Sequence, residues 1–165
     1  AAQRIADLSL DELEGMLIET SDEPYAYEVA KAVIDSRRRE KIETTTQLRE
    51  IIEKALQFLP AKERKDEIKK CCARTFQALR IDVNSEFEVL YDFLEKLPDA
   101  LNPGGRVAIL TFHSGEDRLV KKSFKALKKA GIYSDVANEV IRPSREECNM
   151  NPRAKSTKMR WAVKL

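Results

Sequence analysis

The 165-residue sequence has few glycines and cysteines and no long apolar run. No stretch approaches the roughly 18 consecutive apolar residues of a transmembrane helix, and no leader precedes a cleavage site, so we expect neither a membrane span nor a secretory signal. Cys71, Cys72 and Cys148 form no Cys-x-x-Cys pair, which argues against a metal site and a disulfide framework. The sequence therefore predicts a soluble protein of a reducing, cytosol-like compartment.

The sparse glycines also limit the chemistry that can be assigned. Neither G-x-G-x-x-G nor G-x-x-x-x-G-K-[ST] occurs, so the chain shows no recognisable phosphate or dinucleotide loop. A G-x-S-x-G elbow is absent as well, which gives acyl transfer little support. If the protein binds a nucleotide-like cofactor, we expect the cradle to lie outside these residues.

Charge is abundant but unevenly distributed. The net charge is +2, yet residues 118–165 hold 13 Lys/Arg against 4 Asp/Glu, whereas residues 1–58 hold 8 against 13. A basic segment suggests a polyanionic partner, because neutralised phosphates release their counterions. A solvated, lysine-rich helix face is the alternative interpretation.

Apolar periodicity predicts helices over most of the first 97 residues. Ser9 with Glu12 forms a capping box before the first clear helix, and Thr44 with Gln47 marks the third. The first 58 residues therefore predict three helices, and residues 61–97 continue as helix. The length of 165 residues suits one domain, or one domain with a small appendage.

The character changes at the turn 102–105. The apolar run Val107–Phe112 is typical of a strand covered on both faces in an α/β sheet. A helix follows to about Ala130, with Ser114 and Asp117 spaced as its capping pair. Residues 139–142 and 159–165 are the remaining strand candidates. Because one buried strand with two others makes a poor isolated sheet, and because the chain begins at Ala1, we expect part of a longer α/β domain.

The lone histidine, His113, follows the most buried strand, at the sheet edge where ligands bind in open α/β folds. Ser114, Asp117 and Arg118 lie next to it in sequence, although helix capping alone also explains the first two. Two further polar groups are candidates for phosphate or base contacts. They are Arg74, Gln77, Arg80 and Asn84 at helical spacing, and Asn151, Arg153 and Lys155 before the last strand. An ordinary helix and a surface loop are the alternatives.

Together these residues form a known pattern. It comprises Arg74–Ile81, Val83–Glu86, Pro103–Arg106, Phe112–Arg118 and Asn151–Ser156. In order and spacing, these motifs closely resemble the S-adenosylmethionine-dependent 16S rRNA (cytosine-N4)-methyltransferases, the family called RsmH or MraW. The resemblance covers essentially the whole chain.

The resemblance implies a Rossmann-like methyltransferase domain that carries an inserted helical, substrate-recognition domain. Residues 1–73 correspond to the helical insertion and residues 74–165 to the C-terminal portion of the methyltransferase domain. The implied reaction is methylation of N4 of a cytidine in the decoding region of small-subunit rRNA. S-adenosylmethionine is the implied cofactor, and its site lies mostly outside this chain. The implied partner is small-subunit rRNA or the small ribosomal subunit.

Carried onto this sequence, the resemblance and the position at the strand end make His113, Ser114 and Asp117 the candidate catalytic residues. The candidate RNA-binding residues are Arg74, Gln77, Arg80, Asn84, Arg118, Asn151, Arg153 and Lys155. The sequence departs from the family pattern in two places. Gly115 stands where the family usually has Leu, and residues 22–28 lack the usual Arg- and Phe-containing stretch.

Other hypotheses remain open. A truncated, non-catalytic homologue that binds RNA or the ribosome is the second function, and a subunit completed by another chain is the third. The cytoplasm is the expected location, with plastid or mitochondrion as alternatives. In isolation, the exposed face of residues 107–112 predicts homodimerisation or aggregation.

Overall fold

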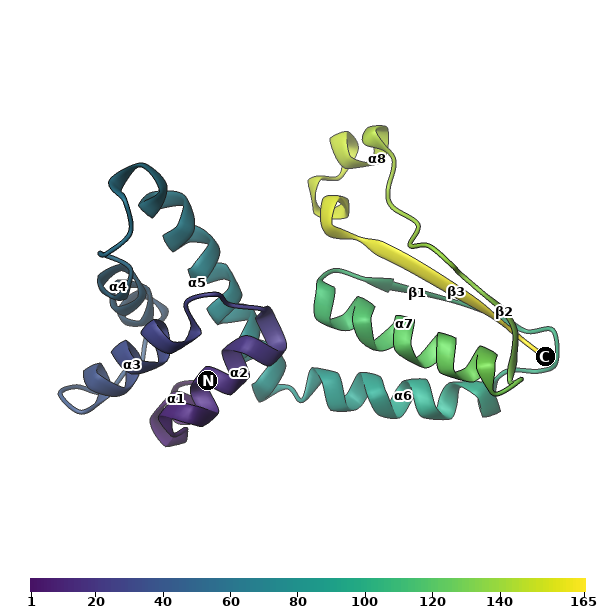
Figure 1. The fold of residues 1–165 in the computed structure, drawn as a ribbon, viewed down its shortest axis with the longest axis horizontal. Coiled ribbons are helices and arrows are strands. Elements are labelled where there is room, and N and C mark those ends of the chain that lie inside the picture. The colour runs from purple at the N-terminus through teal and green to yellow at the C-terminus, as the bar shows by residue number, and fades with distance from the viewer. The chain divides into compact units, whose positions relative to one another are not determined.

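The computed structural model describes all 165 residues, which form two compact units, residues 1–86 and 87–165. The first contains only helices and the second is mixed α/β (Figure 1). The predicted α/β class is therefore confirmed. Helix α5 runs through residue 73, so the domain boundary implied there falls inside a continuous helix. None of the helices combines the length and the apolar character that a bilayer crossing needs.

Unit 1 is built from α1 (Ala2–Asp7), α2 (Leu10–Ser21), α3 (Ala26–Arg37), α4 (Thr45–Ala55) and α5 (Ala61–Val83). Both predicted capping boxes are present, with Ser9 and Thr44 accepting hydrogen bonds from the backbone N–H groups of Glu12 and Gln47. The apolar faces of the unit 1 helices meet in one core that includes Leu17, Val29 and Ile52. The prediction of three helices before residue 58 missed α1, which is too short for a periodic pattern and buries only Ile5.

Unit 2 continues with α6 (Glu86–Ala100), β1 (Arg106–Thr111), α7 (Ser114–Lys129), β2 (Tyr133–Val136), α8 (Arg145–Met150), a 3₁₀ turn (Pro152–Ser156) and β3 (Lys158–Lys164). The sheet has the order β1-β3-β2, and both outer strands pair antiparallel with β3. Helices α6 and α7 share a core with the strands around Phe124, Tyr133 and Ala162.

One strand expectation was wrong in detail. The second strand is Tyr133–Val136, and from residues 139–142 only Ile141 pairs, in an isolated bridge with Met159. The strand β1 is not central within this chain, because it pairs with β3 alone. Its core-side residues Val107 and Ile109 pack inward, whereas Leu110 is 58% exposed. The run is apolar on both faces, but the described residues cover only one of them.

Gly115 lies where the first turn of α7 meets the start of α6. A Cβ added there would come within 2.5 Å of Cζ of Phe87 and 3.3 Å of Nδ1 of His113. The Phe87 ring also packs against the imidazole, with centroids 5.9 Å apart. The missing side chain therefore makes room for an aromatic ring beside the lone histidine.

We expect Gly115→Ala to destabilise the protein by about 1–3 kcal/mol, because the new methyl overlaps Phe87. Gly15→Ala is the matched control, since Gly15 is also helical and has nothing within 4 Å of the added Cβ. It should stabilise by about 0.5–1 kcal/mol. Urea unfolding measures both, and a stabilising Gly115→Ala would contradict the packing described.

Candidate functional site

His113 connects the end of β1 to α7 and caps that helix. Its Nδ1 accepts a hydrogen bond from the backbone N–H of Glu116 at 3.5 Å, so the cap lies one residue before the predicted Ser114. His113 combines the extended backbone and the side-chain acceptor that a cap requires, whereas the prediction relied on the more common caps Ser and Asp. Because Nδ1 accepts, the ring proton of the neutral form is assigned to Nε2.

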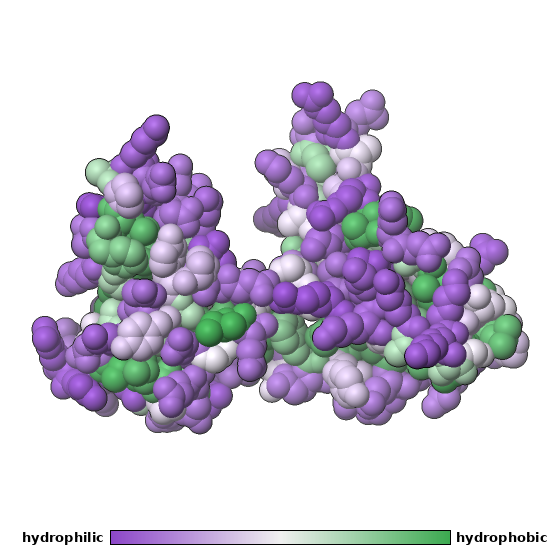
Figure 2. Space-filling model, viewed as in Figure 1, coloured by the Kyte–Doolittle hydropathy of each residue, from purple (hydrophilic) through white to green (hydrophobic).

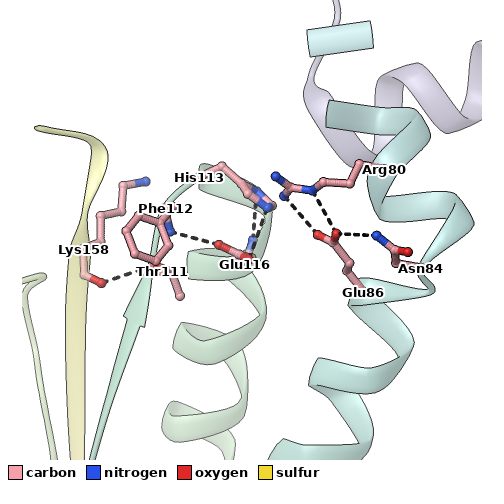
Figure 3. A network of polar contacts seen from close by, with 8 residues as sticks. All are labelled: Arg80, Asn84, Glu86, Thr111, Phe112, His113, Glu116 and Lys158. Carbon is pink, nitrogen blue, oxygen red and sulfur yellow. Dashed lines mark hydrogen bonds and ion pairs between the residues drawn. The ribbon is translucent and has the colours of Figure 1, made fainter. Parts of the chain in front are cut away.

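The Nε2 atom of His113 is buried and has no hydrogen-bond partner. It lies 3.5 Å from Oε1 of Glu116, which is ion-pair distance without hydrogen-bond alignment. The other carboxylate oxygen of Glu116 accepts from the backbone N–H of Phe112 at 2.9 Å (Figure 3). The adjacent His113 side chain lowers the pKa of Glu116, against the effect of burial. A carboxylate and an unsatisfied imidazole N–H thus lie side by side at the strand end.

Asp117 joins the first turn of α7 to strand β3. Its two carboxylate oxygens accept from Nε and Nη2 of Arg160 at 2.7 and 3.1 Å, and both residues are buried. Lys158 Nζ lies 3.9 Å away. Burial by itself would raise the pKa of Asp117, but the hydrogen bonds and charge of Arg160 outweigh it and lower the pKa. The pair ties the histidine corner to the sheet.

The remaining predicted residues of unit 2 are exposed around the same end of the sheet. Ser114 and Arg118 lie in the first turns of α7. Asn151 caps the 3₁₀ turn by accepting from the backbone N–H of Arg153 at 3.2 Å, and Arg153 and Lys155 are exposed on that turn. The turn leads directly into Lys158 and β3, whose Arg160 holds Asp117.

In unit 1, Arg74 belongs to a buried ion pair. Its Nε donates to Glu23 at 2.8 Å, and the Glu23 side chain is 0% exposed. Glu23 also accepts from the backbone N–H of Tyr25 at 3.0 Å, which fixes the α2–α3 connection on α5. Burial, followed by the Glu23 charge, raises the pKa of the neighbouring Cys71 thiol to about 12. Arg74 is therefore engaged in holding unit 1 together, and its role toward RNA stays a prediction.

The other predicted residues of unit 1 lie further along α5. Arg80 forms two hydrogen bonds with Glu86, at 2.9 and 3.0 Å, and Asn84 donates to the same carboxylate at 3.2 Å (Figure 3). Gln77 is half-buried and makes no side-chain hydrogen bond. Arg80 and Asn84 border a largely apolar pocket of about 330 Å³ between α1, α4 and α5. The structure thus places the predicted residues in two groups, one in each unit.

Sequence reasoning missed Arg160 and Phe87 and left Glu116 out of the site. The sequence did carry a signal for Arg160, because it lies within the apolar strand Met159–Leu165. A cation that faces inward from such a strand needs a buried partner. Phe87 gave no signal, since its packing on Gly115 joins residues of two helices.

Comparison with known proteins shows the family to which the chain belongs. A model described as the MraW methylase family matches residues 1–165, and the chain therefore belongs to that family. The predicted resemblance is confirmed. The chain is 66% identical over 165 residues to the ribosomal RNA small subunit methyltransferase H 1 of Lachnoclostridium phytofermentans, covering 99% of this chain and 45% of that protein.

Two further relatives agree. The methyltransferase H 1 of Agathobacter rectalis is 67% identical and the methyltransferase H 2 of Alkaliphilus metalliredigens is 59% identical, each over 99% of this chain and 47% of its own length. The chain thus spans slightly less than half the length of these relatives.

The Asp117–Arg160 pair predicts a defined pH dependence of stability. The folded pKa of Asp117 is lowered, so its stabilisation is present above the unfolded value of about 3.9 and is lost as pH falls through the folded pKa. Asp117→Asn should cost about 3 kcal/mol at neutral pH, because Arg160 loses its buried counter-ion. The difference in unfolding free energy between Asp117→Asn and wild type should become smaller in acid.

Urea unfolding at neutral pH and at about pH 3 measures this difference. Asp99→Asn is the control, since Asp99 is exposed on α6. An Asp117→Asn deficit that is equally large at both pH values would show that the carboxylate charge is not the stabilising element.

Proposed function

We propose that the protein methylates N4 of a cytidine in the decoding region of small-subunit rRNA, with S-adenosylmethionine as methyl donor. Family membership over the whole chain and relatives named ribosomal RNA small subunit methyltransferases support methylation of rRNA. The resemblance of the motifs supports the cytidine N4 target. Within the chain, the observation that carries the proposal is the His113 corner, with its unpartnered buried donor at a strand end.

The exocyclic amine of cytosine is a poor nucleophile because its lone pair is delocalised into the ring. Catalysis then depends on holding N4 in line with the donor methyl group. In the proposed role, Nε2–H of His113 donates to an acceptor of the target nucleotide, and the Ser114 hydroxyl, which can donate or accept, contacts its polar edge. Asp117 already accepts two hydrogen bonds from Arg160, so we assign it the positioning of this corner.

The described residues lack the glycine-rich turn that typically holds a nucleotide-like cofactor such as S-adenosylmethionine. No strand is followed by a glycine-rich turn, and the one glycine at a strand-to-helix junction, Gly115, has its open side filled by Phe87. We therefore propose that other residues of the full methyltransferase bind the cofactor. The uncovered face of the sheet, where Leu110 pairs with Met159 and Ala108 with Trp161, and the unpaired edge of β1 would adjoin them.

The lack of such a turn favours one second candidate, an RNA- or ribosome-binding module without catalysis. The concentration of positive charge in residues 118–165 is compatible with it. Cofactor binding separates the two candidates. Calorimetric titration of S-adenosylmethionine into the 165-residue chain should show no binding, and binding should appear in the product of the complete reading frame that encodes it. One-site binding to the chain alone would contradict the proposal that other residues bind the cofactor.

The activity is tested with the product of that complete reading frame, small-subunit rRNA and labelled S-adenosylmethionine. We expect N4-methylcytidine as the labelled nucleoside. His113→Ala should lower kcat at least about tenfold, because a hydrogen bond from a buried donor contributes on the order of 1–3 kcal/mol. Asn138→Ala, at an exposed position, should leave kcat unchanged. Label in another nucleoside would refute the target, and a fully active His113→Ala would remove His113 from the site.

A further inference from the structure

Helix α7 is rich in cations, and some of its lysines make no ion pair within the chain. From residue 118 to its end it contains Arg118 and five lysines but no acidic residue. Lys128 pairs with Asp135 at 2.8 Å. Lys122, Lys125 and Lys129 are exposed and have no carboxylate at ion-pair distance. These three lysines, at positions i, i+3 and i+7, are called the lysine stripe below.

On other helices of the chain, several surface cations have an acidic partner on the same helix. Arg49 pairs with Glu53, Lys70 with Glu67, and Lys96 with Asp92, each three or four residues away. Such neighbours stabilise a helix by about 0.2–0.5 kcal/mol, and like charges at the same spacing destabilise it by similar amounts. Lysines near the C-terminus gain from the helix dipole, but Lys122 in the middle of α7 does not. The stripe is therefore not explained by the stability of α7.

The stripe lies along one face of α7, opposite the buried Val120 and Phe124. At a rise of 1.5 Å per residue, it extends about 10 Å along the axis. Its N-terminal end leads toward the first turn, which His113 caps. The view in Figure 2 shows a largely hydrophilic surface over this helix. A chain of phosphates running along α7 would thus approach the His113 corner.

The apolar side of α7 excludes one alternative use of the stripe. A helix that binds a lipid surface must present apolar residues beside its cations. In α7 the apolar residues, such as Val120 and Phe124, are packed in the core of unit 2. The stripe therefore suits a hydrated polyanion better than a bilayer.

We propose that Lys122, Lys125 and Lys129 bind the phosphodiester backbone of the RNA strand that leads to the His113 corner. This inference rests on the proposed function, which supplies RNA as the polyanion, and adds the surface that holds it. Lysine contacts to phosphates contribute affinity without sequence preference, and they make binding depend on salt.

The test compares two triple variants of the 165-residue chain. K122Q/K125Q/K129Q removes the stripe. K62Q/K65Q/K69Q is the matched control, because these lysines are also exposed, have the same spacing on α5 and lie among Glu63, Asp66 and Glu67. Both variants change the net charge equally. Fluorescence anisotropy with a labelled, unstructured RNA of about 20 nucleotides, over a range of salt concentrations, measures binding.

The stripe variant should bind about tenfold or more weakly at low salt, and the slope of log K against log salt should decrease by about 2. The control should bind within about twofold of wild type, because its charges are locally balanced. K122R/K125R/K129R should restore binding, and thermal unfolding confirms that each variant folds.

Equal weakening by both triple variants would overturn the inference, since net charge alone would then explain binding. Unchanged binding of the stripe variant, or no RNA binding by the wild-type chain, would also overturn it. None of these results bears on the proposed function, which depends on methyl transfer and on the identity of the methylated nucleoside.

Discussion

The buried pair between Asp117 and Arg160 is the interaction on which the candidate site depends. It joins the first turn of α7 to the central strand β3 through two hydrogen bonds. His113 caps the same turn, and Glu116 within it binds the backbone of Phe112. Without this pair, the helix N-terminus would be held mainly by apolar packing, which is less specific about its position along the strand. The orientation of the imidazole therefore follows from a contact that involves no predicted RNA-binding residue.

Two groups of charged residues in this chain have different roles. One group forms ion pairs that stabilise the fold, as in Asp117–Arg160 of unit 2 and Glu23–Arg74 of unit 1. Both pairs are buried or nearly so, and each links elements distant in sequence. The other group is exposed and unmatched, as in the lysine stripe and in Arg153 and Lys155. A sequence motif cannot distinguish the two groups. An arginine at helical spacing gives the same pattern whether its partner is a buried carboxylate or a phosphate.

Local features were predictable and long-range ones were not. The capping boxes at Ser9 and Thr44, the strand after the 102–105 turn, helix α7 and the final strand all follow from patterns within a few residues. The second strand was misplaced, because Tyr133–Val136 contains two polar residues at a β-bulge that breaks its alternation. Partners such as Arg160 and Phe87 depend on tertiary packing. The position of His113 was predictable from the strand that precedes it, but its capping role was not.

The most direct test of this account is a double-mutant cycle between Asp117 and Arg160, measured by urea unfolding of Asp117→Ala, Arg160→Ala and the double variant. If the pair fixes α7 on β3, the double variant should be more stable than the sum of the single effects predicts, with a coupling free energy of about 2 kcal/mol or more. Single effects that add to within about 0.5 kcal/mol would mean that the two residues act independently. In that case other contacts would hold the His113 corner in place, which would contradict a role of the pair in fixing α7 on β3.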